Sequence, residues 1–197
     1  ILEDLMREKK PYNIYPNPKD VELLVEKINN SKRPLIISGR GANNCDESLI
    51  SFLDKSGILY LDTQESRGVV PYNHTSNVFA ARSKVMSEAD LIILLGRKLD
   101  YQLAYGSPAI FKNASFVRIS DVAHELTDNR RGDPEIYTNP KTFFEKLNQI
   151  NLKTNFDNQW LSGIKDFHQK KLNKKSVIKT NKLGKDLKIN PEFIFAC

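Results

Sequence analysis

Cysteine and histidine are scarce in this chain of 197 residues, and their scarcity excludes several kinds of site. The two cysteines, Cys45 and Cys197, are too few for the disulfide framework of a small secreted protein. Neither of them stands at metal-ligand spacing from His74, His124 or His168. We therefore predict no structural zinc ion and no other metal site.

The sequence also lacks a long apolar run. No stretch approaches the roughly 18 consecutive apolar residues of a membrane span. Residues 1–10 carry acidic side chains where a secretory signal would be apolar. These absences predict a cytoplasmic protein with no membrane partner.

A third absence is that of a catalytic constellation. No nucleophile is recognisable together with a base and a residue that orients the base. Asp62, Asp100 and Tyr101 are the side chains most readily mistaken for an acid–base group, but capping and turn roles are commoner for such residues. We assign no catalytic residue.

The net charge of +6 suggests a nucleic-acid partner, but its location argues against one. Residues 168–188 hold eight lysines and one acid, whereas residues 1–167 hold 22 basic and 22 acidic side chains. A lysine run without aromatic residues is typical of a solvated linker, and an RNA-binding tail would add arginines or stacking aromatics. We predict a flexible linker over 168–188 and no nucleic-acid partner. Nucleic-acid binding through this tail stays as an alternative.

What the sequence does contain is an alternation of helix and strand patterns. The Asn-Pro pairs at 17–18 and 139–140 each supply an N-cap followed by a first-turn proline before an amphipathic stretch. Between these two predicted helices, Asn44 and Glu47 have the spacing of a capping box. The helix that they open is predicted to end at Gly57.

Short runs that are mostly apolar predict five strands, of which the last is the weakest: residues 33–39, 57–62, 89–96, 114–120 and 135–139. Such strands alternating with helices indicate a parallel sheet with helices on both faces. The predicted fold class is α/β, with a doubly wound, mainly parallel sheet over residues 18–150. A docking helix is predicted over 151–167 from large apolar residues at helical spacing: Phe156, Trp160, Ile164 and Phe167.

Gly39 and Gly41 follow the first predicted strand and precede a helix, which is where an open parallel sheet binds ligands. A helix N-terminus at this point offers unpaired amides to a phosphate, and glycine allows a close approach. The dinucleotide fingerprint would need a third glycine at the position of Asn44. The pair is equally compatible with a phosphate site and with a plain tight turn.

Residues 33–111 carry landmarks in a fixed order: "RP" at a strand entry, the glycine pair, "GILYLDT", "RGVVPYNH", "ADLIILLG" and "GRKLDY". In this order they resemble the central domain of the thiamine diphosphate-dependent enzymes, among them acetolactate synthase, oxalyl-CoA decarboxylase and 2-hydroxyacyl-CoA lyase. The resemblance implies a degenerate Rossmann-like (DHS-like) fold. It also implies that residues 1–17 end a pyrimidine-binding domain and that residues 189–197 begin a diphosphate-binding domain.

The resemblance implies a larger enzyme in which thiamine diphosphate and Mg²⁺ bind in the flanking domains, so this chain alone would not be catalytic. A homodimer or homotetramer is expected. The acetolactate synthase type, acting on 2-keto acids, is our first expectation. The oxalyl-CoA decarboxylase or 2-hydroxyacyl-CoA lyase type is the alternative, toward which "AARS" and "LDYQLAYGSPAIF" lean. A free-standing NAD-binding domain is an alternative of another class.

In this family the central domain is a former nucleotide-binding module, which holds FAD in acetolactate synthase and ADP in oxalyl-CoA decarboxylase. By position, the resemblance implies that FAD or ADP would meet Gly39, Arg40, Gly41, Ser66, Arg67, Gly68, Arg82, Gly96, Arg97, Ser120 and Asp121. Two departures favour an empty site. Relatives usually read Ile-Asp-x-Asp where this chain has Ser120 and then Asp121, and Gly-Asp where it has Thr138 and Asn139.

Overall fold

The computed structural model describes the backbone of residues 14–182 and the side chains of residues 14–174. Most of the segment expected to end a preceding domain, and all of residues 189–197, lie outside the described residues. None of the helices in the described range has the length and apolar character needed to cross a membrane.

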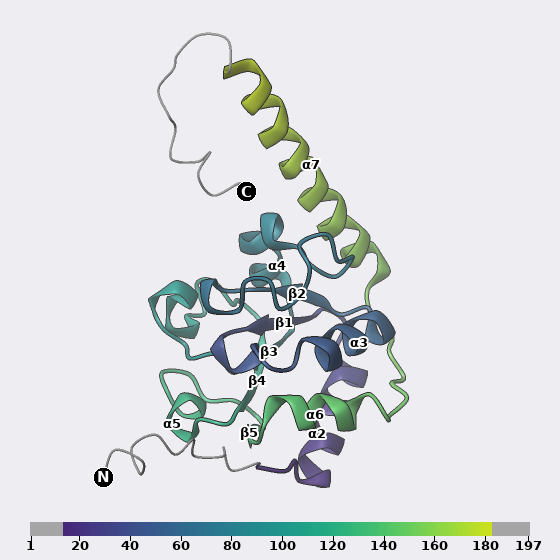
Figure 1. Cartoon of the computed structure of the whole chain (residues 1–197), viewed down its shortest axis with the longest axis vertical. Coiled ribbons are helices and arrows are strands. Elements are labelled where there is room, and N and C mark those ends of the chain that lie inside the picture. Colours follow the sequence, from purple (N-terminus) through teal and green to yellow (C-terminus); the bar gives the residue numbers. More distant parts are fainter. Residues whose placement is uncertain (1–13, 183–197) are drawn as a thin grey trace, which may run out of the picture.

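The fold is built on a five-stranded sheet in which every pairing is parallel. In the order β2-β1-β3-β4-β5, the strands are β2 Leu59–Leu61, β1 Pro34–Ser38, β3 Leu91–Leu95, β4 Ser115–Ser120 and β5 Glu135–Tyr137. All five predicted runs are strands, the weakest included. β1 and β3 are neighbours although they are not consecutive, so the winding direction reverses between them (Figure 1).

Helices cover both faces of the sheet, as predicted. The helices are α2 Pro18–Asn30, α3 Asp46–Ser56, α4 Arg82–Glu88, α5 Ala123–Leu126, α6 Pro140–Leu147 and α7 Asn158–Lys182. Four 3₁₀ segments join them, namely η1 Arg40–Ala42, η2 Gln64–Ser66, η3 Phe79–Ala81 and η4 Tyr101–Gly106. α2, α3 and α6 pack on one face, whereas α4, η4 and the start of α7 pack on the other.

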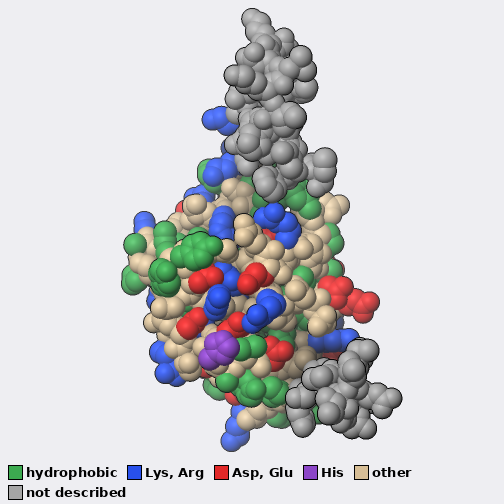
Figure 2. Space-filling model, turned by 60° about the vertical axis from the view of Figure 1, so that its left-hand side comes forward, with side chains coloured by type: hydrophobic (Ala, Val, Ile, Leu, Met, Phe, Trp, Pro, Cys, Tyr) green, Lys and Arg blue, Asp and Glu red, His purple; other side chains and the backbone are tan. Residues whose placement is uncertain are grey.

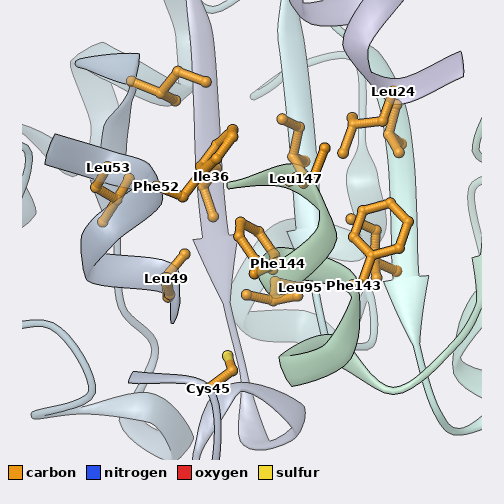
Figure 3. Packing of buried hydrophobic residues seen from close by; sticks show 14 of the residues in the cluster. Leu24, Ile36, Cys45, Leu49, Phe52, Leu53, Leu95, Phe143, Phe144 and Leu147 are labelled. Carbon is orange, nitrogen blue, oxygen red and sulfur yellow. The ribbon is translucent and has the colours of Figure 1, made fainter. Parts of the chain in front are cut away.

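Alternate side chains of β1, β2 and β3 therefore enter two different apolar clusters. Ile36 of β1 meets the α2/α3/α6 cluster, whereas its neighbours Leu35 and Ile37 enter the α4/α7 cluster. Figure 3 shows the first cluster, in which Phe52 and Phe144 meet edge to face with ring centroids 5.2 Å apart. Because both faces are covered, the central strands are buried along their whole length.

The helix caps follow the sequence in two of three cases. Asn17 accepts a hydrogen bond from the Lys19 amide, and Asn139 accepts one from the Thr142 amide, as predicted. The capping box at Asn44 is wrong. α3 begins one residue later behind Cys45, whose amide continues the η1 turn by donating to Ala42 O. This turn takes up residues 40–45 and moves the helix start beyond the reach of the Asn44 side chain.

Helix α7 differs from the expectation for the C-terminal region. Its first turns dock on the sheet through Trp160, Ile164 and Phe167 of the predicted apolar stripe. The helix begins at Asn158 and not at residue 151, and Phe156 of the stripe precedes it and packs against the other cluster. The helix then continues through residues 168–182, where the sequence favoured a flexible linker, and it leaves the body of the domain (Figure 1). Lys, Gln and Leu have high helix propensity, so a docked first half can propagate into a lysine-rich second half.

His168 anchors the point at which α7 leaves the body. Its ring lies edge-on to Phe79 of η3 with centroids 4.9 Å apart, and its Nδ1 accepts a hydrogen bond from the Ala80 amide at 3.2 Å. Burial lowers the pKa of His168 below its ordinary value. The neutral imidazole is therefore the form that fits this contact.

The stability of the chain should fall as pH drops below about 6.5, in part through His168. Since its pKa is lower in the folded chain, the unfolded chain binds the proton first and is favoured as pH falls through this range. We expect the loss in Tm between pH 7.5 and 5.5 to be smaller in His168→Gln than in the wild type. Equal losses would contradict the assignment.

Leu24 and Leu23 form a matched pair on α2 that tests the packing of the first cluster. Leu24 is fully buried, whereas Leu23 is 43% exposed. Leu24→Ala should lower the free energy of unfolding by about 2–5 kcal/mol, because it leaves a cavity against the sheet. Leu23→Ala should change it by less than about 0.5 kcal/mol. Urea denaturation of both variants measures the difference, and equal effects would contradict the packing.

Candidate functional site

The predicted nucleotide-site residues do gather at the carboxyl ends of the parallel strands, the side of the sheet called the carboxyl edge below. They follow β1, β2, β3 and β4, and the carboxyl ends of parallel strands meet at one edge. Arg82, at the start of α4, reaches the same edge and donates to the Asp62 carbonyl at 3.1 Å. Figure 1 places α5, which follows β4, at this edge of the molecule. The edge includes the reversal point between β1 and β3, where such sheets bind ligands.

The two glycines of the turn after β1 do not leave their amides free for a phosphate. The Gly39 amide donates to Leu95 O at 2.9 Å, and the Gly41 amide donates to Gly96 O at 3.1 Å. Both acceptors lie at the end of β3. The hydrogen bonds that a phosphate would take from these two glycines are therefore made within the protein.

The glycines instead allow two backbone segments to touch. A Cβ on Gly41 would lie 2.7 Å from the Gly96 Cα, closer than non-bonded carbons approach. Gly96 has a φ of +54°, a left-handed conformation that glycine adopts without strain. Of the two interpretations of this pair, the geometry supports the tight turn.

Arg97 follows directly and is buried, whereas the resemblance placed it on the rim of a ligand site. Its side chain is 1% exposed. Nη1 donates to Glu65 at 2.6 Å, and Nη2 donates to Asp100 at 2.7 Å and to Gln102 at 3.0 Å. Arg97 thus ties η2 to η4 across the carboxyl edge.

A second ion pair lies beside the first. Arg40, on the glycine turn, donates to the buried Glu125 at 2.7 Å, and Ser120 Oγ donates to the other carboxylate oxygen at 3.3 Å. Asp121 is exposed, and its carboxylate has no hydrogen bond or ion pair with the described residues. Asp121 is thus the acidic side chain that is open to a ribose at this position.

Arg67 and Arg82 are the arginines of the edge that have no carboxylate ion pair among the described residues. Arg67 is exposed and Arg82 is half-buried. Burial raises the pKa of Asp62, and the charges of Arg67 and Arg82 oppose that rise. Burial also lowers the pKa of Arg82, against the attraction of Asp62. These two guanidiniums are the groups best placed to meet an added anion.

A buried hydroxyl network fixes the loop after β2, and sequence reasoning did not find it. Ser66 Oγ donates to Ser38 O at 2.9 Å and accepts from the Thr63 amide at 3.0 Å. Ser38 Oγ lies 2.5 Å from Tyr60 Oη, and burial raises the pKa of Tyr60 to about 12. Ser66, predicted at the rim, is therefore inside the protein, while the neighbouring Gly68 is exposed with a φ of +93°.

Charges at this edge are balanced. Four arginines (Arg40, Arg67, Arg82, Arg97) lie at or next to four carboxylates (Asp62, Glu65, Asp100, Glu125) within the described residues. Figure 2 shows basic and acidic side chains interspersed on the side of the molecule that comes forward from the left of Figure 1. Two hollows of the described surface are lined by none of these arginines, one beside Trp160 and Lys84 and the other beside Asn44 and Asn148.

The family is decided by a match of residues 21–147 to the thiamine pyrophosphate enzyme central domain. The chain belongs to this family. Mouse 2-hydroxyacyl-CoA lyase 1 is 30% identical over 148 residues, which are 71% of this chain and 25% of the mouse protein. The human enzyme of that name is 36% identical over 105 residues, 52% of this chain and 18% of its own length. Oxalyl-CoA decarboxylase of Escherichia coli K12 is 30% identical over 119 residues, 59% of this chain and 21% of its own.

A solved structure shares the fold of this chain. A putative thiamin diphosphate-dependent enzyme from Mycobacterium smegmatis superposes with a TM-score of 0.61 at 15% identity, over 75% of this chain and 30% of that one. At this identity the similarity establishes the fold. The chain spans about a quarter of the length of the curated relatives that it matches.

Thiamine diphosphate is the cofactor of the family. Within residues 14–182, no cluster of three or more His, Cys, Asp or Glu side chains is arranged to hold a metal ion. A nucleotide diphosphate does not fit the glycine turn, because the Gly39 and Gly41 amides are taken and Arg97 packs over Gly39.

Gly41→Ala and Gly163→Ala separate steric contact from the general effect of removing glycine. The new methyl group at position 41 would meet the Gly96 backbone, whereas nothing lies within 4 Å of a Cβ at Gly163 in α7. We expect Gly41→Ala to lower the free energy of unfolding by about 1–3 kcal/mol. Gly163→Ala should raise it by about 0.5–1 kcal/mol through helix propensity. A neutral Gly41→Ala in chemical denaturation would contradict the backbone contact.

Proposed function

We propose that this chain is the structural central domain of a thiamine diphosphate enzyme that cleaves or decarboxylates a CoA thioester. The observation that carries the proposal is the match to the central domain, together with relatives named 2-hydroxyacyl-CoA lyase and oxalyl-CoA decarboxylase. These names favour the second of the two enzyme types that the sequence indicated. The acetolactate synthase type, acting on 2-keto acids, stays the alternative.

In such an enzyme this chain would hold the flanking domains in position. Thiamine diphosphate, when bound, supplies a carbanion that attacks the substrate carbonyl carbon. The described residues supply a sheet covered on both faces and a carboxyl edge at which two of the four arginines, Arg40 and Arg97, are engaged in ion pairs. We assign no catalytic nucleophile and no acid–base pair among the described residues. The domain holds its neighbours in place, and the reacting groups belong to other domains.

Several finer expectations stay predictions within this proposal. Arg67 and Arg82 have no carboxylate partner among the described residues and are open to a nucleotide phosphate, but the engaged amides of Gly39 and Gly41 oppose binding of FAD or ADP. Mg²⁺ in the flanking domains, a homodimer or homotetramer, and a cytoplasmic location follow from the resemblance and the composition. Because the chain belongs to the central-domain family, we drop the alternative of a free-standing NAD-binding domain.

The proposal is tested by assaying two proteins side by side. The complete protein in which this chain occurs should cleave a 2-hydroxyacyl-CoA or decarboxylate oxalyl-CoA, and should need added thiamine diphosphate. The 197-residue chain alone should show no turnover, because the described residues hold no catalytic group. Acetolactate formation from pyruvate without activity on CoA thioesters would favour the alternative enzyme type. Turnover by the chain alone would overturn the structural role.

A further inference from the structure

The space outside the reversal point of the sheet is filled by a side chain of the protein itself. In an open parallel sheet, ligands bind in the crevice between the strands on either side of this point. In this chain Arg97 leaves the end of β3 and lies over the turn that follows β1. A Cβ on Gly39 would lie 2.7 Å from Arg97 Cδ and 2.8 Å from its Cβ. The aliphatic part of Arg97 therefore rests on the glycine backbone that a diphosphate would approach.

The guanidinium of Arg97 takes its partners from both sides of the crevice. Glu65 lies in η2, after β2, whereas Asp100 and Gln102 lie at the start of η4, after β3. The Gln102 side chain also donates from Nε2 to Oε1 of Gln64 in η2, at 3.5 Å. A buried guanidinium is stable only when its charge is compensated, and two carboxylates and an amide oxygen compensate this one.

One donor of Arg97 stays without a partner. Its Nε has no hydrogen bond among the described residues, and it is closed off from solvent. A ligand atom can reach this donor only after the ion pairs of Arg97 open. An added diphosphate would then leave Glu65 and Asp100 without their cation and would face those carboxylates. The exchange would break both ion pairs of Arg97.

We propose that Arg97 closes the nucleotide crevice from within, so that this central domain keeps its fold with neither FAD nor ADP bound. The side chain replaces a nucleotide as the group that holds the loops after β1, β2 and β3 together. This inference does not depend on which reaction the complete enzyme catalyses. It means that neither FAD nor ADP binds to this domain, contrary to the expectation from the family resemblance.

Ligand titration of the unmodified 197-residue chain tests the closure directly. ADP and FAD at 1 mM should leave its Tm unchanged within about 1 °C, and isothermal titration calorimetry should show no saturable heat. A ligand at 100 times its Kd would add stability that a Tm measurement detects easily. A saturable rise in Tm with either nucleotide would overturn the proposal.

Variants of Arg97 test whether its side chain holds the loops after β1, β2 and β3 together. Arg97→Met keeps the aliphatic stem but leaves Glu65 and Asp100 unpaired, so we expect Tm to fall by roughly 10 °C. Lys98→Met is the matched control, since Lys98 is exposed and follows Arg97 directly in the chain, and its Tm should stay within about 2 °C. An Arg97→Met protein as stable as the wild type would overturn the proposal.

Glu65→Gln provides the same test if Arg97→Met does not fold. Glu65 is partly exposed, so this variant removes one ion pair of Arg97 without leaving a cavity. We expect a smaller fall in Tm, of a few °C, with no recovery on addition of ADP or FAD. Recovery with a nucleotide, or a Tm equal to that of the wild type, would contradict a closed crevice.

Discussion

The contact between two stretches of backbone, at Gly41 and at Gly96, is the constraint on which the carboxyl edge depends. The turns after β1 and β3 approach so closely that neither position has room for a Cβ. Their mutual hydrogen bonds use the amides of the first turn. This approach sets where η1 begins, moves the start of α3 to Asp46, and directs Arg97 across the edge.

Two buried arginines hold together the loops around this backbone contact. Arg97 joins the loops after β2 and β3. Arg118 joins the segments that follow β4, by donating to the carbonyls of Asp128 and Arg130 at 2.7 and 2.9 Å. Both side chains are 1% exposed, and each is compensated within its own loops. The ion-paired arginines at this edge therefore serve the structure, which agrees with a domain that positions its neighbours.

The sequence predicts the repeating elements well because each depends on local information. The strands are nearly continuous apolar runs, and the caps at Asn17 and Asn139 act over two and three residues. The edge depends on contacts between distant segments, which periodicity does not report. Whether the Gly41 amide is free depends on Gly96, and whether Arg97 is exposed depends on Glu65. The family resemblance located the site residues in one place, but their roles required the structure.

The state of the Gly39 and Gly41 amides is the central claim, and amide hydrogen exchange followed by NMR measures it most directly. If Leu95 and Gly96 are their acceptors, both amides exchange slowly in the nucleotide-free chain, and addition of ADP or FAD leaves their rates unchanged. Fast exchange in the free chain, followed by protection when a nucleotide is added, would contradict the account.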